Sequence, residues 1–323
     1  MKKVTTAIVL ILAAWSVFEI VLYTSRPEAP KVVLTIPQEM KPAVKEEVKQ
    51  IEEMPLQAEG SVPAEKTEPV ENKPVQETRQ LSDEAAVSAL VYPETTQALA
   101  KLFENFDRQA VPRIYVGAFP QDFKEDGTPA LFAKTLLPLI LAENEKIAAE
   151  RQKLLPIVVK IRHGETLTDQ EAQFFDYLKT KYDVVEVGPL YQVKELLQRV
   201  DRVSPALAVT QALEATQGGK DLTSVFGIDK WNEAEEFVPA TYPDLRQTVA
   251  DYALHLNTTV PYYVFWELRS LNRDKRQPMK ARVFMDGLTS YRYGDRFYVQ
   301  KLIDVYEKYG LSNLDDTQLE KEK

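Results

Sequence analysis

The chain has 323 residues, with 40 Lys and Arg against 49 Asp and Glu and a formal net charge of -9. No cluster of basic residues is present to contact phosphates, which argues against a nucleic-acid partner. The chain has no cysteine and only two histidines, His163 and His255. The composition therefore predicts no disulfide framework, no thiolate or histidine-based metal site, and no cofactor.

Residues 1–23 are predicted to form a membrane anchor. Lys2 and Lys3 precede an apolar run from Val4 to Tyr23, and a helix of about 20 residues crosses a hydrocarbon core of roughly 30 Å. The lysines favour a cytoplasmic N-terminus, which predicts a single-pass inner-membrane protein with its C-terminal domain in the periplasm. A cleaved signal peptide is the alternative, although no small-residue cleavage site follows the run.

Residues 24–80 are predicted to be a disordered linker. The segment is rich in Pro, Glu and Lys, and its apolar residues are too sparse to offset the entropy cost of ordering the chain. Proline keeps such segments extended. The linker is either a tether that lets a domain search beyond the membrane or an inert connection.

Residues 81–311 are predicted to form one mainly α-helical domain, followed by a flexible tail at 312–323. Apolar spacing and local stop signals predict the helices. Weak extended pieces are expected at 157–161 and 184–187. The helices are expected at 82–105, 128–155, 168–182, 193–200, 205–217, 243–256, 260–271 and 294–309.

Several helix ends carry specific capping signals. Thr168 with Glu171 three residues later forms a capping-box pattern, and Pro129 follows Thr128 at a first helical turn. Ser204 and Pro205 start another helix, which Gly218 and Gly219 end.

Glu214 is the carboxylate that stands out by its position. It lies near the end of the helix that Pro205 begins, where the helix dipole disfavours an ionised carboxylate. Leu207 and Leu213 lie close to it along the helix, so partial desolvation is expected. Both effects favour the protonated form that a general acid needs. A solvated surface glutamate is the alternative interpretation.

The segment around Glu214 resembles the region of the catalytic glutamate in the bacterial Bax-type branch of the glucosaminidase family. The matching run is RVDRVSPALAVTQALEATQGG, which includes the A-x-x-E pattern that ends at Glu214. Five further blocks agree in order and spacing, so that the resemblance covers about Ser82 to Leu311. These blocks lie at 111–123, 136–155, 224–231, 241–259 and 287–302.

The resemblance implies a lysozyme-like, α-rich fold. It also implies cleavage of the glycosidic bond next to N-acetylglucosamine in peptidoglycan, whose glycan strands would be the partner. Glu214 would be the catalytic general acid, with Tyr291 assisting catalysis from the closing block, and no cofactor is implied. Phe226, Trp231 and Tyr242 would bind substrate. A core aromatic is the alternative for Tyr291, and core packing is the alternative for the tryptophan.

Two departures from the family pattern bear on the mechanism. The turn after Glu214 is short and lacks the family's tryptophan, and Arg246 and Gln247 stand where the family often has a glutamate. Asp244, Glu233, Glu235 and Glu236 lie nearby in sequence but do not match that glutamate. A mechanism assisted by the substrate's own N-acetyl group needs no second carboxylate, and both routes stay open.

Three functions fit the sequence. The first is an anchored cell-wall hydrolase, and the second is a catalytically weak or inactive peptidoglycan-binding scaffold on the same fold. The third sets the resemblance aside and predicts an envelope-spanning adaptor that docks on a partner protein.

Overall fold

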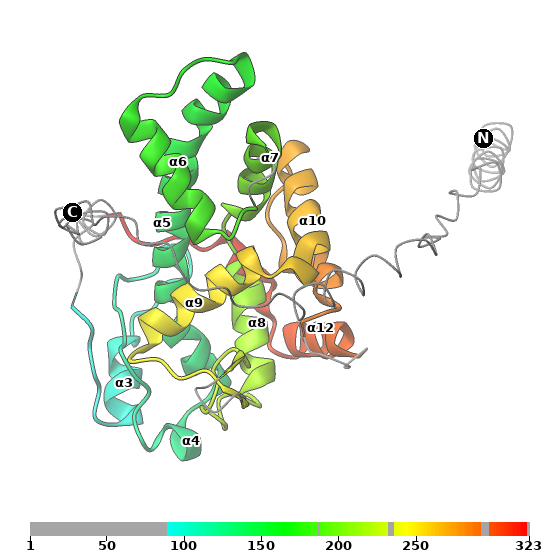
Figure 1. Cartoon of the computed structure of the whole chain (residues 1–323). Coiled ribbons are helices and arrows are strands. Elements are labelled where there is room, and N and C mark those ends of the chain that lie inside the picture. The colour runs from blue at the N-terminus through cyan, green and yellow to red at the C-terminus, as the bar shows by residue number, and fades with distance from the viewer. Residues whose placement is uncertain (1–88, 186–187, 232–235, 292–296, 322–323) are drawn as a thin grey trace, which may run out of the picture. The chain divides into compact units, whose positions relative to one another are not determined.

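The chain is mainly α-helical, as predicted, in the computed structural model (Figure 1). The structure describes residues 89–185, 188–231, 236–291 and 297–321. The predicted anchor (1–23) and linker (24–80) lie outside the described residues. From residue 89 onward, no described helix is both long enough and apolar enough to cross a membrane.

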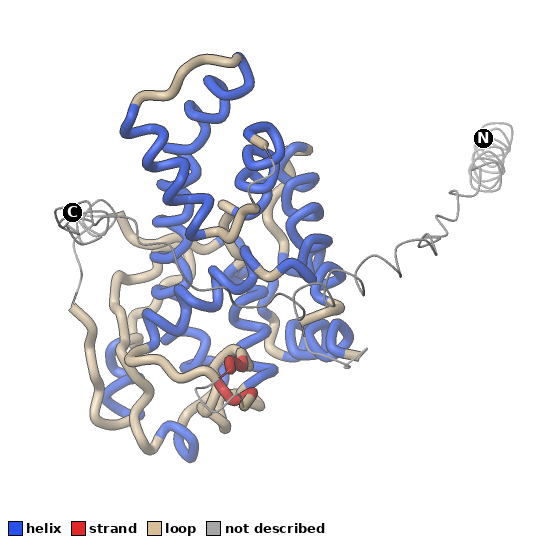
Figure 2. Tube along the Cα trace, in the orientation of Figure 1, coloured by secondary structure: helices blue, strands red, loops and turns tan. Residues whose placement is uncertain are grey.

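The elements of the described chain follow one another with short connections. The only two strands in the described part, β1 (Asp229–Trp231) and β2 (Phe237–Pro239), pair antiparallel with Lys230 opposite Val238 (Figure 2). The α-helices are α3 (Thr96–Leu102), α4 (Phe123–Asp126), α5 (Pro129–His163), α6 (Asp169–Lys181), α7 (Pro189–Arg199), α8 (Pro205–Ala215), α9 (Leu245–Thr258), α10 (Tyr263–Asp274), α11 (Ala281–Phe284) and α12 (Tyr298–Lys308). The 3₁₀-helices are η3 (Val260–Tyr262), η4 (Met285–Leu288) and η5 (Leu311–Asp316).

Helix α8 lies in the middle of this arrangement and packs against α5, α11, α12 and η5 (Figure 1). It begins as predicted, because the Ser204 side chain accepts a hydrogen bond from the backbone N–H of Leu207 at 3.0 Å and Pro205 occupies the first turn. Every residue from Pro205 to Leu213 is buried. A helix that is apolar on all sides is stable only when other elements surround it, which explains its central place.

The N-terminal capping signals read from the sequence are confirmed, whereas α8 ends at Ala215 with Thr216 as its C-terminal cap, before the predicted glycines. The Thr168 side chain accepts from the N–H of Glu171, whose carboxylate accepts in return from the N–H of Thr168. Thr128 caps α5 and Pro129 opens it.

Helix α5 is longer than predicted, and the extended piece expected at 157–161 is wrong. Ile157 and Val158 are each 3% exposed and lie on the buried face of α5. Burial of their side chains outweighs the modest preference of β-branched residues for strands. Gly164 ends the helix in the left-handed conformation, with φ of 71°.

The predicted helix at 82–105 is also shorter in the structure. Residues 82–88 lie outside the described part, and the helix starts only at Thr96. Val91 instead pairs with Val116 in a parallel β-bridge. Pro93 lacks an N–H group and its neighbour is biased towards extended backbone, so the helix begins where Thr95 caps it.

The prediction of a flexible tail from residue 312 is wrong for residues 312–321, which pack against the domain. Leu314 and Leu319 are 7% and 8% exposed, and the N–H of Val111 donates to the carbonyl oxygen of Gln318 at 2.9 Å. Asp315 accepts from the Ser204 hydroxyl and from the N–H of Ala206 at the start of α8. The C-terminal segment therefore fixes the N-terminus of α8.

Candidate functional site

Glu214 is the first residue of α8 that is not fully buried. It lies one residue before the helix end at Ala215 and is half-buried, directly after nine buried positions. Its Oε2 atom is shielded from solvent. The carboxyl group therefore lies where the buried core meets the surface, at the negative end of the helix dipole.

One turn before Glu214, the same face of α8 carries a buried amide. Residues three apart on a helix are neighbours, with Cβ atoms about 5–6 Å apart, so Gln211 lies next to Glu214. Gln211 is fully buried. Its Oε1 accepts from the Tyr252 hydroxyl at 2.7 Å and its Nε2 donates to the Tyr298 hydroxyl at 2.9 Å. Both ends of the amide are therefore bound.

Gln211 belongs to a group of neutral side chains that we call the tyrosine cluster. The Tyr291 ring stacks between Tyr262 and Tyr298, with ring centroids 5.5 and 5.4 Å away. The Phe226 ring stacks on Tyr252 at 3.9 Å. The cluster thus has six members: Gln211, Phe226, Tyr252, Tyr262, Tyr291 and Tyr298.

The structure places two of the predicted site residues, Phe226 and Tyr291, inside this cluster. Phe226 is 1% exposed, so direct contact between its ring and a substrate does not fit its position. Tyr291 is 7% exposed and its hydroxyl donates to the carbonyl oxygen of Phe226 at 3.0 Å. Both side chains are part of the buried core, and for Tyr291 this matches the core-aromatic alternative.

Tyr242 lies apart from the tyrosine cluster, in a polar network at the base of the hairpin. Its hydroxyl donates to Asp251 of α9, and Lys230 of β1 binds the same carboxylate at 3.0 Å. The ammonium group of Lys230 also lies 5.0 Å from the centroid of the Tyr242 ring. Burial and the hydrogen bond to Asp251 raise the pKa of Tyr242. Tyr242 is half-buried, so part of its surface is open to a ligand.

Trp231, the third predicted binding residue, lies at the end of β1, where its backbone pairs with Phe237. Phe237 is 55% exposed. Of the acidic residues near the hairpin, Glu233 and Glu235 lie outside the described residues. Asp244 caps α9 by accepting from the N–H of Gln247 at 2.7 Å.

His255 connects the two groups of side chains. It follows Asp251 by four residues on α9, and its ring contacts Tyr291 edge-to-face at 5.9 Å. Its Nε2 lies 3.1 Å from the Tyr262 hydroxyl and its Nδ1 lies 3.2 Å from the Thr259 hydroxyl. Burial lowers the pKa of His255.

Sequence reasoning gave no role to Gln211, Asp251 or His255. The spacing of these residues was a signal. Gln211 precedes Glu214 by three residues and Asp251 precedes His255 by four, and residues at these spacings share a helix face. The side chains that bind Gln211, Asp251 and His255, however, come mainly from other elements, which this spacing does not reveal.

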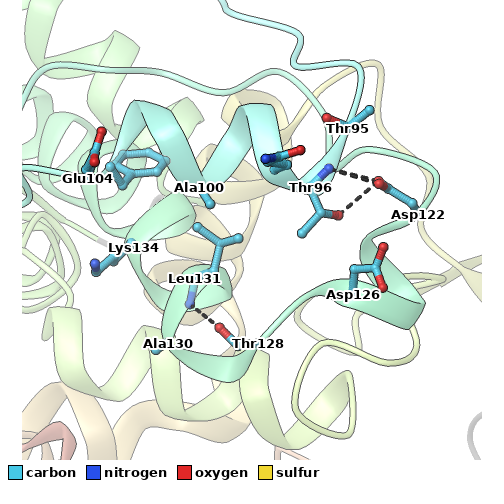
Figure 3. Close-up of a pocket in the computed structure, with 12 residues that line it drawn as sticks. Thr95, Thr96, Ala100, Glu104, Asp122, Asp126, Thr128, Ala130, Leu131 and Lys134 are labelled. Carbon is cyan, nitrogen blue, oxygen red and sulfur yellow. Dashed lines mark hydrogen bonds between the residues drawn. The ribbon is translucent and has the colours of Figure 1, made fainter.

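A separate pocket of about 680 Å³ opens between α3, α4 and the start of α5 (Figure 3). None of the predicted site residues lines it. Within it, Asp122 accepts from the N–H and the hydroxyl of Thr96, each at 2.9 Å. In the described part of the chain, no group of three or more His, Cys, Asp or Glu side chains is arranged to hold a metal ion.

Comparison with known proteins identifies no relative: no protein-family model, no curated protein and no solved structure matches this chain.

Proposed function

We propose that this protein is a membrane-anchored glycoside hydrolase of the bacterial envelope with Glu214 as its general acid. The substrate would be peptidoglycan, cut at the glycosidic bond next to N-acetylglucosamine, and the helical domain would have a lysozyme-like arrangement. Residues 1–23 would hold the chain in the inner membrane, with the domain in the periplasm.

The observation that carries this proposal is the position of the Glu214 carboxyl. It lies at the end of the buried central helix α8, with one oxygen shielded from solvent and the other part of the residue accessible. A general acid must meet the substrate from a site that restricts water. The neighbouring tyrosine cluster adds no formal charge to that site.

In the proposed first step, Glu214 donates its proton to the glycosidic oxygen while the bond from that oxygen to the sugar's anomeric carbon breaks. The acetamido oxygen of the substrate, or a second carboxylate, stabilises the anomeric carbon until water adds to it. The Tyr291 hydroxyl donates a hydrogen bond to the carbonyl oxygen of Phe226, so Tyr291 would assist this step through its position and not by giving a proton. Its ring stacks on Tyr298, which binds Gln211 of α8, so Tyr291 would stabilise the packing beside this helix.

A second function is favoured by one observation. Phe226, expected to bind substrate, and Tyr291, expected to assist catalysis, present almost no surface to a ligand. A peptidoglycan-binding scaffold without hydrolytic activity would tolerate that arrangement.

The test is to incubate the full-length protein, purified in mild detergent, with peptidoglycan and to analyse released fragments by mass spectrometry. Glu214→Gln should lower the rate by about 10²- to 10⁴-fold, the usual contribution of a general acid, with unchanged thermal unfolding. Glu307→Gln is the matched control, because Glu307 is an exposed residue of α12.

Fragments with reducing N-acetylglucosamine ends, produced by the wild type and Glu307→Gln only, would support the proposal. Equal activity in Glu214→Gln would refute the role of Glu214. Binding of peptidoglycan without any fragment release would favour the scaffold.

A further inference from the structure

The turn that follows Glu214 has unusual backbone geometry. Gln217, Gly218 and Gly219 have φ values of 53°, 79° and 90°. Positive φ is unfavourable for a residue with a side chain, such as Gln217. Gly218 and Gly219 adopt positive φ without strain, whereas Gln217 keeps it only where surrounding contacts hold it.

Within the turn, Thr216 provides most of these contacts. It is fully buried, and its carbonyl oxygen accepts from the N–H groups of Gly219, Lys220 and Asp221 at 3.1, 2.8 and 2.9 Å. Its hydroxyl donates to Ala212 at 2.6 Å and accepts from the N–H of Gly219 at 3.0 Å. The turn is therefore folded back on the end of α8.

Side chains from α4 and α5 leave little room around this turn. A Cβ atom added to Gly219 would lie 3.2 Å from the Phe123 ring and 3.3 Å from the Phe132 ring. One added to Gly218 would lie 3.1 Å from the Tyr309 hydroxyl. The close contacts and the positive φ values together favour glycine at both positions.

Lys220 supplies the polar link between this turn and α4. Its ammonium group donates to the carbonyl oxygens of Lys124, Glu125 and Gly127 at 3.0, 3.4 and 3.5 Å. These carbonyls lie at the C-terminal end of α4, where unpaired carbonyl oxygens attract a cation. Lys220 is otherwise exposed, so this link is made at the surface and does not form part of the core.

We propose that Lys220 is a positioning residue for Glu214: it ties the strained turn to α4 and thereby fixes the end of α8 that carries the carboxyl group. The proposal rests on the proposed function for its catalytic consequence. A displacement of about 1 Å at a reacting group can lower a rate by about 100-fold. Loss of this surface link should therefore affect turnover more than folding.

The test uses three variants of the full-length protein in mild detergent. Lys220→Met removes the link and should lower kcat by about 10-fold or more, with KM on peptidoglycan fragments unchanged. Lys220→Arg keeps a donor and should restore most of the rate. Lys124→Met is the matched control, since it removes a neighbouring exposed ammonium group but keeps the carbonyl that Lys220 binds.

Hydrogen exchange of the amides of Gly219, Lys220 and Asp221, followed by mass spectrometry, gives a readout that does not need activity. Lys220→Met should speed exchange in this peptide, and Lys124→Met should not. Unchanged exchange in Lys220→Met would overturn the proposal, as would wild-type kcat in that variant. If the wild type cuts no peptidoglycan, the proposed function fails, while the exchange result still decides whether Lys220 holds the turn.

Discussion

Helix α9 contributes to two buried polar clusters of opposite character. Near its middle, Tyr252 belongs to the neutral tyrosine cluster below Glu214, in which hydroxyl and amide groups pair with one another. Near its end, Asn257 reaches a charged group that we call the arginine cluster, at the C-terminal end of α7. Its members are Arg151, Arg269, Arg273 and Asp201.

The arginine cluster is held by carbonyl oxygens as much as by its one carboxylate. Arg269 is 2% exposed and donates to Asn257 at 2.7 Å and to the carbonyl oxygen of Gln198 at 2.9 Å. Arg273 pairs with Asp201, and Arg151 donates to the carbonyl oxygen of Val200 at 2.7 Å. Burial lowers the pKa of Arg269 to about 10.

The arginine cluster and the tyrosine cluster differ in whether their buried side chains carry charge. The arginine cluster places cations at the end of α7, where the helix dipole and free carbonyls compensate them. The tyrosine cluster next to Glu214 is held by neutral hydrogen bonds and ring stacking. Charged side chains thus join helices in the arginine cluster, whereas uncharged side chains pack around Gln211, one turn before the proposed acid.

The largest effect on stability is expected from Asp201→Ala. It leaves Arg269 and Arg273 without their carboxylate, and breaking a buried ion pair costs roughly 3–5 kcal/mol. We expect about 3 kcal/mol, because the Arg273 side chain is 31% exposed. Urea unfolding measures the change. Asp316→Ala is the control, since its pair with Lys280 is exposed at 67% and 35% and should contribute less than about 1 kcal/mol. Equal losses would remove the distinction between the arginine cluster and a surface pair.

A smaller loss is expected from Gln211→Met, which keeps the volume but leaves the Tyr252 and Tyr298 hydroxyls without their amide. An unsatisfied buried polar group costs about 1–3 kcal/mol. Adding Tyr252→Phe and Tyr298→Phe to that variant should recover most of the stability, because the two hydroxyls that the amide bound are then removed with it. Failure of the triple variant to recover would mean that the amide does more than satisfy the two hydroxyls.

The smallest effect concerns pH and His255. Burial lowers its pKa below the unfolded value of 6.5, although Asp251 opposes the shift and Lys230 adds to it. Between the lowered pKa and 6.5, the unfolded chain therefore binds more protons than the folded chain. The stability from neutral His255 is complete above about pH 6.5 and is lost as the pH falls through the folded pKa.

His255→Gln should flatten the pH dependence of urea unfolding in that window, with His163→Gln as control. His163 is the chain's other histidine and is exposed. An unchanged slope in His255→Gln would show that another group produces the dependence.

The local signals in the sequence determined the starts of α5, α6 and α8 and the position of Glu214 along α8. The caps at Thr128, Thr168 and Ser204 act on N–H groups three residues away, so the sequence alone contains both partners. The placement of Glu214 near the end of α8 follows from Ser204 and Pro205 at the start and the glycines beyond the end, although the structure ends α8 at Ala215, before those glycines.

Only the tertiary structure decided what surrounds that glutamate. Gln211 meets Tyr252 and Tyr298, which lie 41 and 87 residues away in the chain, and Lys220 meets carbonyls 93 to 96 residues earlier. Burial of Phe226, the packing of residues 312–321 and the helical state of residues 157–161 are likewise set by distant neighbours. Caps and periodicity act within about one helical turn, whereas packing partners depend on how all the elements fill the core.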